Sequence, residues 1–142
     1  MIIKSITAKE TYPLRLSVLK TCDAYIYKYQ GDLDKDTLHF GAFKKEVLIG
    51  VVSLMKTANN SFKGKQIQLR GMAVATDYQG KSIGKALVSY VKETCKQQEL
   101  DILWCNAREK AVSFYKKQGF KTIGKLFYIK NVGMHYIMST EI

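Results

Sequence analysis

The segment from Gln66 to Leu87, QIQLRGMAVATDYQGKSIGKAL, constrains the fold more than any other stretch of the chain. It predicts a strand, a loop with spaced glycines and then a helix, because apolar residues recur at helical spacing after Gly80. The free N–H groups and the positive dipole end of that helix would point out of the loop. Such an arrangement binds anions, so we expect a phosphate-bearing ligand here.

The strand before this loop carries a break in its alternation. Apolar side chains alternate at Ile67 and Leu69, and the phase slips by one residue at Gly71 before it resumes at Met72 and Val74. A one-residue slip at a glycine is typical of a β-bulge. An ordinary strand that tolerates a glycine is the alternative interpretation.

The loop itself is compatible with a nucleotide site. Ala75, four residues and then Gly80-Lys81-Ser82 is one residue short of the P-loop of nucleoside triphosphate enzymes, which begins with glycine. However, the segment TDYQ has no glycine to curl around a phosphate, and the later strand DILWC does not end in the aspartate that holds Mg²⁺. A P-loop nucleotide enzyme is therefore the second hypothesis.

The same loop also resembles a different phosphate site. The residues Gln79-Gly80-Lys81-Ser82-Ile83-Gly84 resemble the pyrophosphate loop of the GNAT (Gcn5-related) N-acetyltransferases. The pattern of that family is Gln or Arg, two residues, Gly, one residue, then Gly or Ala. Gln79 and Gly84 fit this pattern, whereas Ser82 stands where the central glycine is usual. This departure leaves open the backbone angle of Ser82 and its effect on coenzyme A binding.

A second motif follows at residues 106–120, NAREKAVSFYKKQGF. It predicts a short helix that is capped by Asn106 and Glu109, carries an apolar stripe through Tyr115, and ends near Gly119. It also resembles the GNAT signature of an asparagine, an alanine-rich turn and Phe-Tyr followed by Gly-Phe. With both motifs at this separation, the chain is identified as a small bacterial-type member of the GNAT family.

The resemblance implies one GNAT-like domain over residues 1–142, of the α/β class and α+β type. We expect a mixed, mostly antiparallel sheet with a parallel β-α-β unit, splayed at a bulged fourth strand and covered by helices on both faces. The pattern of residues predicts a helical region over 12–29, entered at Pro13. It predicts strands at 2–6, 38–43, 47–55, 66–74, 101–105, 121–130 and 134–140.

The family resemblance also implies the chemistry: direct attack of a primary amine on acetyl-CoA, with Tyr115 as the general acid for the leaving thiolate. It implies cofactor contacts from the bulged strand, the loop and one asparagine, and no metal. The residues concerned are Met72, Ala73, Val74, Gln79, Gly80, Lys81, Ser82, Ile83, Gly84, Lys85 and Asn106. A GNAT-like domain that binds acyl-CoA without catalysis is the third hypothesis.

Each candidate has a structural alternative. Tyr115 also fits a core tyrosine on an apolar helix face, and Asn106 also fits a simple helix cap. Lys81 and Lys85 fit solvated surface charges as well.

The general base is unassigned, because the fourth strand offers Gln66, Gln68 and Arg70 but no carboxylate. A water chain, His39, His135 or an aspartate of the 32–36 loop could serve, or the amine could arrive already deprotonated, and each histidine could instead be structural. Arg15 and Arg70 hint at an anionic acceptor.

Charge and cysteine content set expectations for partners and compartment. The net charge of +11 is spread along the chain, which favours solubility and attraction to coenzyme A phosphates over nucleic-acid binding. Three cysteines without metal-like spacing, and no secretory or membrane-spanning run, indicate a cytoplasmic protein with reduced thiols. The expected partner is a small-molecule or peptide amine, and no membrane partner is expected. Whether the protein forms a homodimer is left open.

Overall fold

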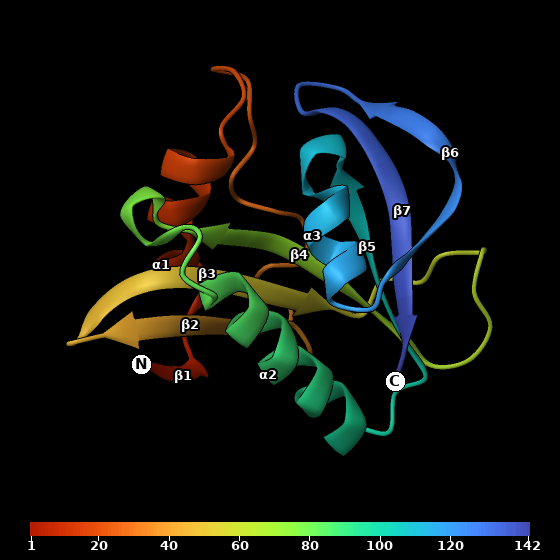
Figure 1. Ribbon diagram of the computed structural model, residues 1–142, viewed down its shortest axis with the longest axis horizontal. Helices are drawn as coiled ribbons and strands as arrows, with labels where there is room; N and C mark the ends of the chain where they lie inside the picture. The colour runs from red at the N-terminus through yellow and green to blue at the C-terminus, as the bar shows by residue number, and fades with distance from the viewer.

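The computed structural model describes residues 1–142, which form one seven-stranded sheet in the order β1-β2-β3-β4-β5-β7-β6 (Figure 1). Only β4 and β5 run parallel, and all other neighbours are antiparallel. The predicted mixed, mostly antiparallel sheet is therefore confirmed. The strands are β1 (Ile2–Ser5), β2 (Leu38–Lys44), β3 (Val47–Met55), β4 (Gln66–Val74), β5 (Ile102–Arg108), β6 (Lys121–Ile129) and β7 (Gly133–Glu141).

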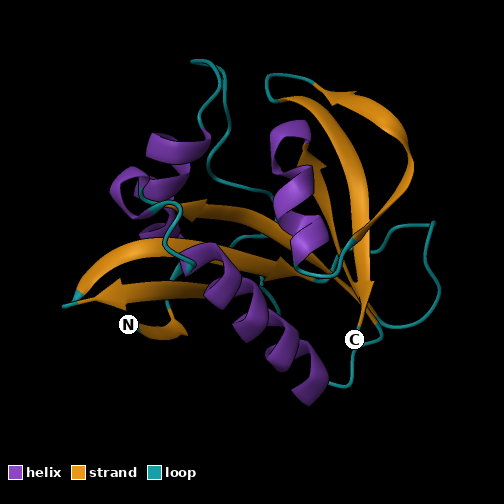
Figure 2. Cartoon of the chain, viewed as in Figure 1, coloured by secondary structure: helices purple, strands orange, loops and turns teal.

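Helices cover both faces of this sheet (Figure 2). On one face, Arg15 of the π-helical turn η1 (Arg15–Leu19), which follows α1 (Ala8–Leu14), donates to the side chain of Ser53 on β3. On the other, α2 (Ile83–Gln97) packs on Val52 of the same strand. Adjacent strand residues point to opposite faces, so the two helical layers lie on opposite sides. The remaining helices are η2 (Thr76–Tyr78), η3 (Glu109–Ala111) and α3 (Val112–Lys117).

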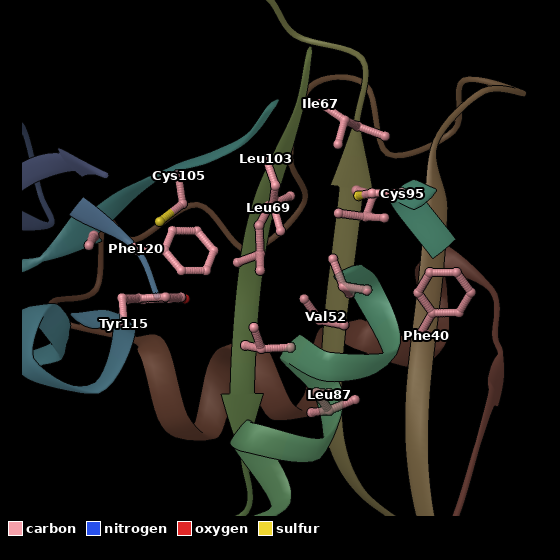
Figure 3. Packing of buried hydrophobic residues seen from close by; sticks show 14 of the residues in the cluster. Phe40, Val52, Ile67, Leu69, Leu87, Cys95, Leu103, Cys105, Tyr115 and Phe120 are labelled. Carbon is pink, nitrogen blue, oxygen red and sulfur yellow. The ribbon is translucent and has the colours of Figure 1, made fainter. Parts of the chain in front are cut away.

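The main core lies between α2, α3 and the sheet (Figure 3). Leu87 and Val91 of α2 are fully buried against strand residues such as Leu69 and Leu103. Cys95 and Cys105 are buried free thiols within this core, and Cys22 is an exposed free thiol. None of the helices combines the length and the apolar character that a bilayer-spanning helix needs.

The bulge expected at Gly71 is present. Val51 pairs with Ala73 and Ser53 with Arg70, so β4 contains one more residue than β3 across this step. Gly71 has a φ of +58°, in the left-handed region that favours glycine. Below the bulge, β4 pairs with β5 only over Gln66–Gln68, and the two strands separate beyond it. The predicted splay of the sheet at the bulged fourth strand is confirmed.

The predicted helical region over 12–29 is wrong at both ends. The helix α1 begins at Ala8, because Thr7 and Glu10 form a capping box, and Pro13 lies inside it rather than in its first turn. After Pro13 the chain continues as η1, consistent with a proline disturbing the helical hydrogen-bond ladder. Residues 20–37 form no helix.

The predicted cap at Asn106 is also wrong. Asn106 lies within β5 and pairs with Ile137 of β7, and α3 begins only at Val112 with no side-chain cap. The reason is that β7 supplies a pairing partner for every residue of β5 up to Arg108. Backbone pairing with β7 therefore outweighs the local helix signal of NAREK.

Candidate functional site

A cavity of about 870 Å³ opens where β4 and β5 separate. Its walls come from β4 beyond Gln68, from the end of β5, from the loop before α2, from α3, and from two segments that the sequence motifs did not include. These are the segment after η1 and the turn between β6 and β7. The cavity thus joins the loop before α2 (residues 79–84, here called the anion loop), the bulge and the second motif in one site.

One end of the cavity is formed by the loop before α2. The first backbone hydrogen bond of the helix runs from the Ala86 N–H to the Ser82 carbonyl, and the N–H groups of residues 80–85 have no acceptor in the protein. The φ of Gly80 is +74°, and a Cβ there would have no atom within 4 Å. Ser82 takes φ +66° and ψ 15°, so the serine adopts the angle that a glycine favours.

The loop residues named from the sequence divide into two groups. Gln79, Gly80 and Gly84 line the cavity, and Gly84 has no side chain that would crowd Phe114, 3.2 Å from the position of a Cβ. The side chains of Lys81, Ser82, Ile83 and Lys85 do not line it, and Ile83 packs in the core. Gln79 donates to the Val74 carbonyl over 2.9 Å, which fastens the loop to the end of β4.

The strand edges beside this loop carry the next candidates. Met72, Ala73 and Val74 line the cavity along the part of β4 that has no β5 partner. Their edge can therefore offer backbone groups to a ligand. Asn106 lines the opposite wall from β5, is exposed, and its side chain makes no hydrogen bond within the protein.

Tyr115 belongs to both the core and the cavity. Its ring is 6% exposed, contacts Phe114 and Phe120 edge-on with ring centroids 5.2 Å apart, and extends from α3 toward β4 (Figure 3). Its hydroxyl is neither hydrogen-bonded nor fully enclosed, and the residue lines the cavity. Burial raises the pKa of Tyr115 well above its usual value, and the Cys105 thiol raises it further. The phenol therefore stays protonated and can donate.

The two histidines differ in their surroundings. Both ring nitrogens of His39 are occupied, by Ser53 at 2.6 Å and by the Asp32 carbonyl at 2.9 Å. His135 lines the cavity, and its Nδ1 donates to the Gly133 carbonyl over 2.7 Å, which leaves the Nε2 lone pair free. Burial and the nearby Arg108 lower the pKa of His135 despite that hydrogen bond, so the ring is neutral at pH 7.

Arg15 and Asp32 are not available to a ligand. Arg15 is fully buried and donates two hydrogen bonds, of 2.7 and 3.0 Å, to the Asp32 carboxylate. The expectation that Arg15 contacts an anionic acceptor is therefore wrong, and Asp32 is ruled out among the aspartates of the 32–36 loop that could serve as the base. Asp34 and Asp36 line a separate hollow of about 390 Å³.

Sequence reasoning missed part of the far wall. Arg108 lines the cavity from the end of β5. The sequence pattern predicted a helix over 106–120 and therefore did not identify this residue as a site residue. Tyr25 and Tyr29 line it as well, and their hydroxyls lie 2.5 Å apart. The sequence offers one signal for this pair, since the two tyrosines stand four residues apart. That spacing would place them on one face of a helix, but their segment forms no helix, so the spacing did not predict where their side chains lie.

A family model described as "Acetyltransferase (GNAT) domain" matches residues 8–139. The chain belongs to the GNAT acetyltransferase family. This GNAT protein is therefore an acetyl-CoA-dependent N-acetyltransferase, and the hypothesis of a P-loop nucleotide enzyme is wrong.

Individual proteins resemble this GNAT enzyme along its length. An uncharacterized N-acetyltransferase, YitI of Bacillus subtilis strain 168, is 28% identical over 138 residues, which cover 96% of this chain and 93% of the relative. The crystal structure of Escherichia coli ElaA superimposes with a TM-score of 0.81 at 19% identity, covering 98% of this chain and 99% of the other. An aminoglycoside 6′-N-acetyltransferase complexed with coenzyme A superimposes with a TM-score of 0.75 at 14% identity, covering 99% and 97%.

Proposed function

We propose that this GNAT enzyme binds acetyl-CoA along the split between β4 and β5 and passes the acetyl group directly to a primary amine, with Tyr115 as the general acid. One observation carries this proposal: Tyr115, whose hydroxyl has no hydrogen-bond partner in the protein, lines the same cavity as the unpaired backbone of β4 and the loop before α2. The acceptor is expected to be a small-molecule or peptide amine, and the homodimer and the cytoplasmic location remain predictions.

The residues of the cavity fit coenzyme A. The free N–H groups of residues 80–85, at the positive end of α2, suit its pyrophosphate, and the charges of Lys81 and Lys85 add attraction. The β4 edge at Met72, Ala73 and Val74 suits the amides of the pantetheine arm, with Asn106 facing it from β5. Acetyl-CoA supplies the activated thioester carbonyl. That the aminoglycoside enzyme of the same fold was crystallised with coenzyme A also supports this fit.

The chain's own groups meet the remaining chemical demands. Backbone N–H groups at the bulge can stabilise the oxyanion that forms when the amine nitrogen attacks the carbonyl. Tyr115 then gives its phenolic proton to the sulfur as the C–S bond breaks. His135 takes the proton that the amine loses, because it lines the cavity, its Nε2 has no hydrogen-bond partner in the protein, and its ring is neutral. One proton is thus donated by Tyr115 and one is accepted by His135.

Replacing Tyr115 with phenylalanine tests the proposal. Because only the hydroxyl is lost, we expect kcat to fall by about 10²–10⁴-fold while the KM for acetyl-CoA changes little. The ring contacts with Phe114 and Phe120 remain, so the melting temperature should be kept. Steady-state thiol release with an accepted amine measures the effect.

Tyr128→Phe is the matched control, because Tyr128 is 65% exposed and lies outside the cavity. It should retain full activity. A Tyr115→Phe enzyme as active as the wild type would remove the general acid from the mechanism. Absence of stabilisation by acetyl-CoA in a thermal-shift assay would contradict the binding site itself.

A further inference from the structure

The cavity wall opposite the anion loop has an unusual charge balance. None of the 30 residues that line the cavity is aspartate or glutamate, whereas Arg70, Arg108, Lys110 and Lys130 all line it. A protonated or polycationic amine would meet only like charges here, and an anionic group would meet only opposite ones. This balance bears on the acceptor, because the amine must enter the same cavity.

The three arginines of the chain gather around this wall, while its twenty lysines are spread along the sequence. Arg15 and Arg70 stack on the ring of Tyr29, with guanidinium carbons 3.9 and 4.5 Å from its centroid. Arg108 lies 5.7 Å from the ring centroid of Tyr25, whose hydroxyl contacts that of Tyr29. Arginine differs from lysine in presenting a planar fork that fits a carboxylate.

These arginines differ in whether they have an acidic partner. The protein has two salt bridges, Arg15–Asp32 and Lys20–Asp23, and neither includes Arg70 or Arg108. Arg70 is half-buried, and its one side-chain hydrogen bond is weak, to the Met55 sulfur at 3.7 Å. Arg108 is half-buried too and donates one bond to the Leu19 carbonyl, over 2.7 Å. Most of their N–H donors therefore have no acceptor in the protein, and both residues line the cavity.

From this wall we infer that the acceptor is an amine that also carries a carboxylate, of the α-amino acid type, and that Arg70 and Arg108 form its carboxylate subsite. The inference rests on the proposed function, since it names the acceptor class of the same site. Arg70 immediately precedes the bulge at Gly71, where the amine must attack, so a carboxylate held there keeps the amine close to the reacting carbonyl.

The test compares acceptors that differ in one group. A panel of α-amino acids is assayed beside the corresponding amides and decarboxylated amines, such as phenylalanine, phenylalaninamide and phenethylamine, with spermidine as a polycation. The amide has the more readily deprotonated amine, so an enzyme indifferent to the carboxylate would favour the amide. We expect kcat/KM to favour the amino acid by about 10- to 100-fold, the range of a charge-assisted hydrogen bond.

Variants locate the subsite. Arg70→Met and Arg108→Met should each reduce kcat/KM for the amino acid by a larger factor than kcat/KM for its amide, and the larger loss of this preference identifies the guanidinium nearer the carboxylate. Arg70→Lys should retain part of the preference, because it keeps the charge and loses the fork. Lys125→Met is the control for simple loss of charge, because Lys125 is exposed and outside the cavity, and it should leave the preference intact.

Two outcomes would overturn the inference. One is equal or faster acetylation of the amides, of phenethylamine or of spermidine. The other is turnover of no carboxylate-bearing amine by an enzyme that acetyl-CoA still stabilises in a thermal-shift assay. The proposed function would fail in a different way, because acetyl-CoA would then give no stabilisation and no amine would release thiol.

Discussion

The two ends of the cavity are built from different parts of the polypeptide. The end at α2 consists of backbone N–H groups from consecutive residues, 80–85, and side chains contribute little to its walls. The far end consists of side chains from segments distant in sequence, among them Tyr25, Arg70, Arg108 and His135. The first end therefore tolerates changes of side chain as long as its backbone angles are kept, and the second depends on how several segments are held together.

A buried scaffold holds the far end. Arg15 joins Asp32, Ser53 and the Tyr27 carbonyl, and so fixes the segment between η1 and β2 against the sheet. A Cβ on Gly71 would lie 2.9 Å from the Arg15 Nε, so the scaffold also abuts the bulge. Damage to the scaffold should thus affect the acceptor end and leave the loop at α2 intact.

The largest effect is expected for Arg15→Met, which leaves the Asp32 carboxylate buried without its partner. The free energy of unfolding should fall by about 3–5 kcal/mol, the usual cost of breaking a buried ion pair. Urea unfolding followed by circular dichroism measures the change.

The control for Arg15→Met is the double variant Arg15→Met/Asp32→Leu, in which no buried charge is left unpaired. It should be more stable than the single variant. If the two variants have the same free energy of unfolding, the packing of the Arg15 side chain, and not its ion pair with Asp32, stabilises this part of the protein.

Gly71→Ala should have the next largest effect. The new Cβ would lie 2.8 Å from Tyr29 and 2.9 Å from Arg15, at a φ of +58°. Backbone strain of about 1–2 kcal/mol and overpacking of about 1–3 kcal/mol should together lower the free energy of unfolding. The same urea unfolding experiment measures it.

Gly80→Ala is the matched control for Gly71→Ala, because Gly80 has a similar φ of +74° but open space around it. It should show the backbone strain alone. Equal destabilisation by the two variants would mean that the scaffold around Arg15 moves freely away from the bulge.

The pH profile separates the two histidines. Burial lowers the pKa of His135 below its ordinary value of 6.5, so half of the molecules carry a protonated His135 only at a pH below 6.5. The kcat measured at saturating amine should therefore persist from neutral pH down to below pH 6.5 and then fall as His135 gains a proton and can no longer act as a base. His135→Gln should lower kcat/KM by about 10²-fold and remove this acid limb.

His39→Gln serves as the comparison, because both nitrogens of His39 hold the scaffold and the residue does not line the cavity. It should lower stability and keep the acid limb. An acid limb that survives in His135→Gln would assign the base to another group or to solvent.

The same contrast explains how far the sequence could predict this molecule. The loop, the bulge and the strand hairpins are local features, and glycine spacing, alternation and turn residues were sufficient to predict them. Asn106 and Arg108 were placed on a helix because their local signal was helical, whereas pairing with β7 holds them in β5. The burial of Arg15 against Asp32, seventeen residues later, has no local pattern at all.

The smallest effect is expected at Ser82, and it tests whether the loop end depends on its backbone alone. Ser82 holds φ +66°, so a serine there is strained, and its hydroxyl makes no hydrogen bond in the protein. Ser82→Gly removes the strain but frees the unfolded chain, and the net gain in stability should be below about 1 kcal/mol. The KM for acetyl-CoA should stay within twofold, and Ser82→Ala, which keeps the Cβ and loses the hydroxyl, should match the wild type. A KM that rises several-fold in both variants would show that the Ser82 hydroxyl contacts a phosphate, and the loop end would then depend on a side chain as the acceptor end does.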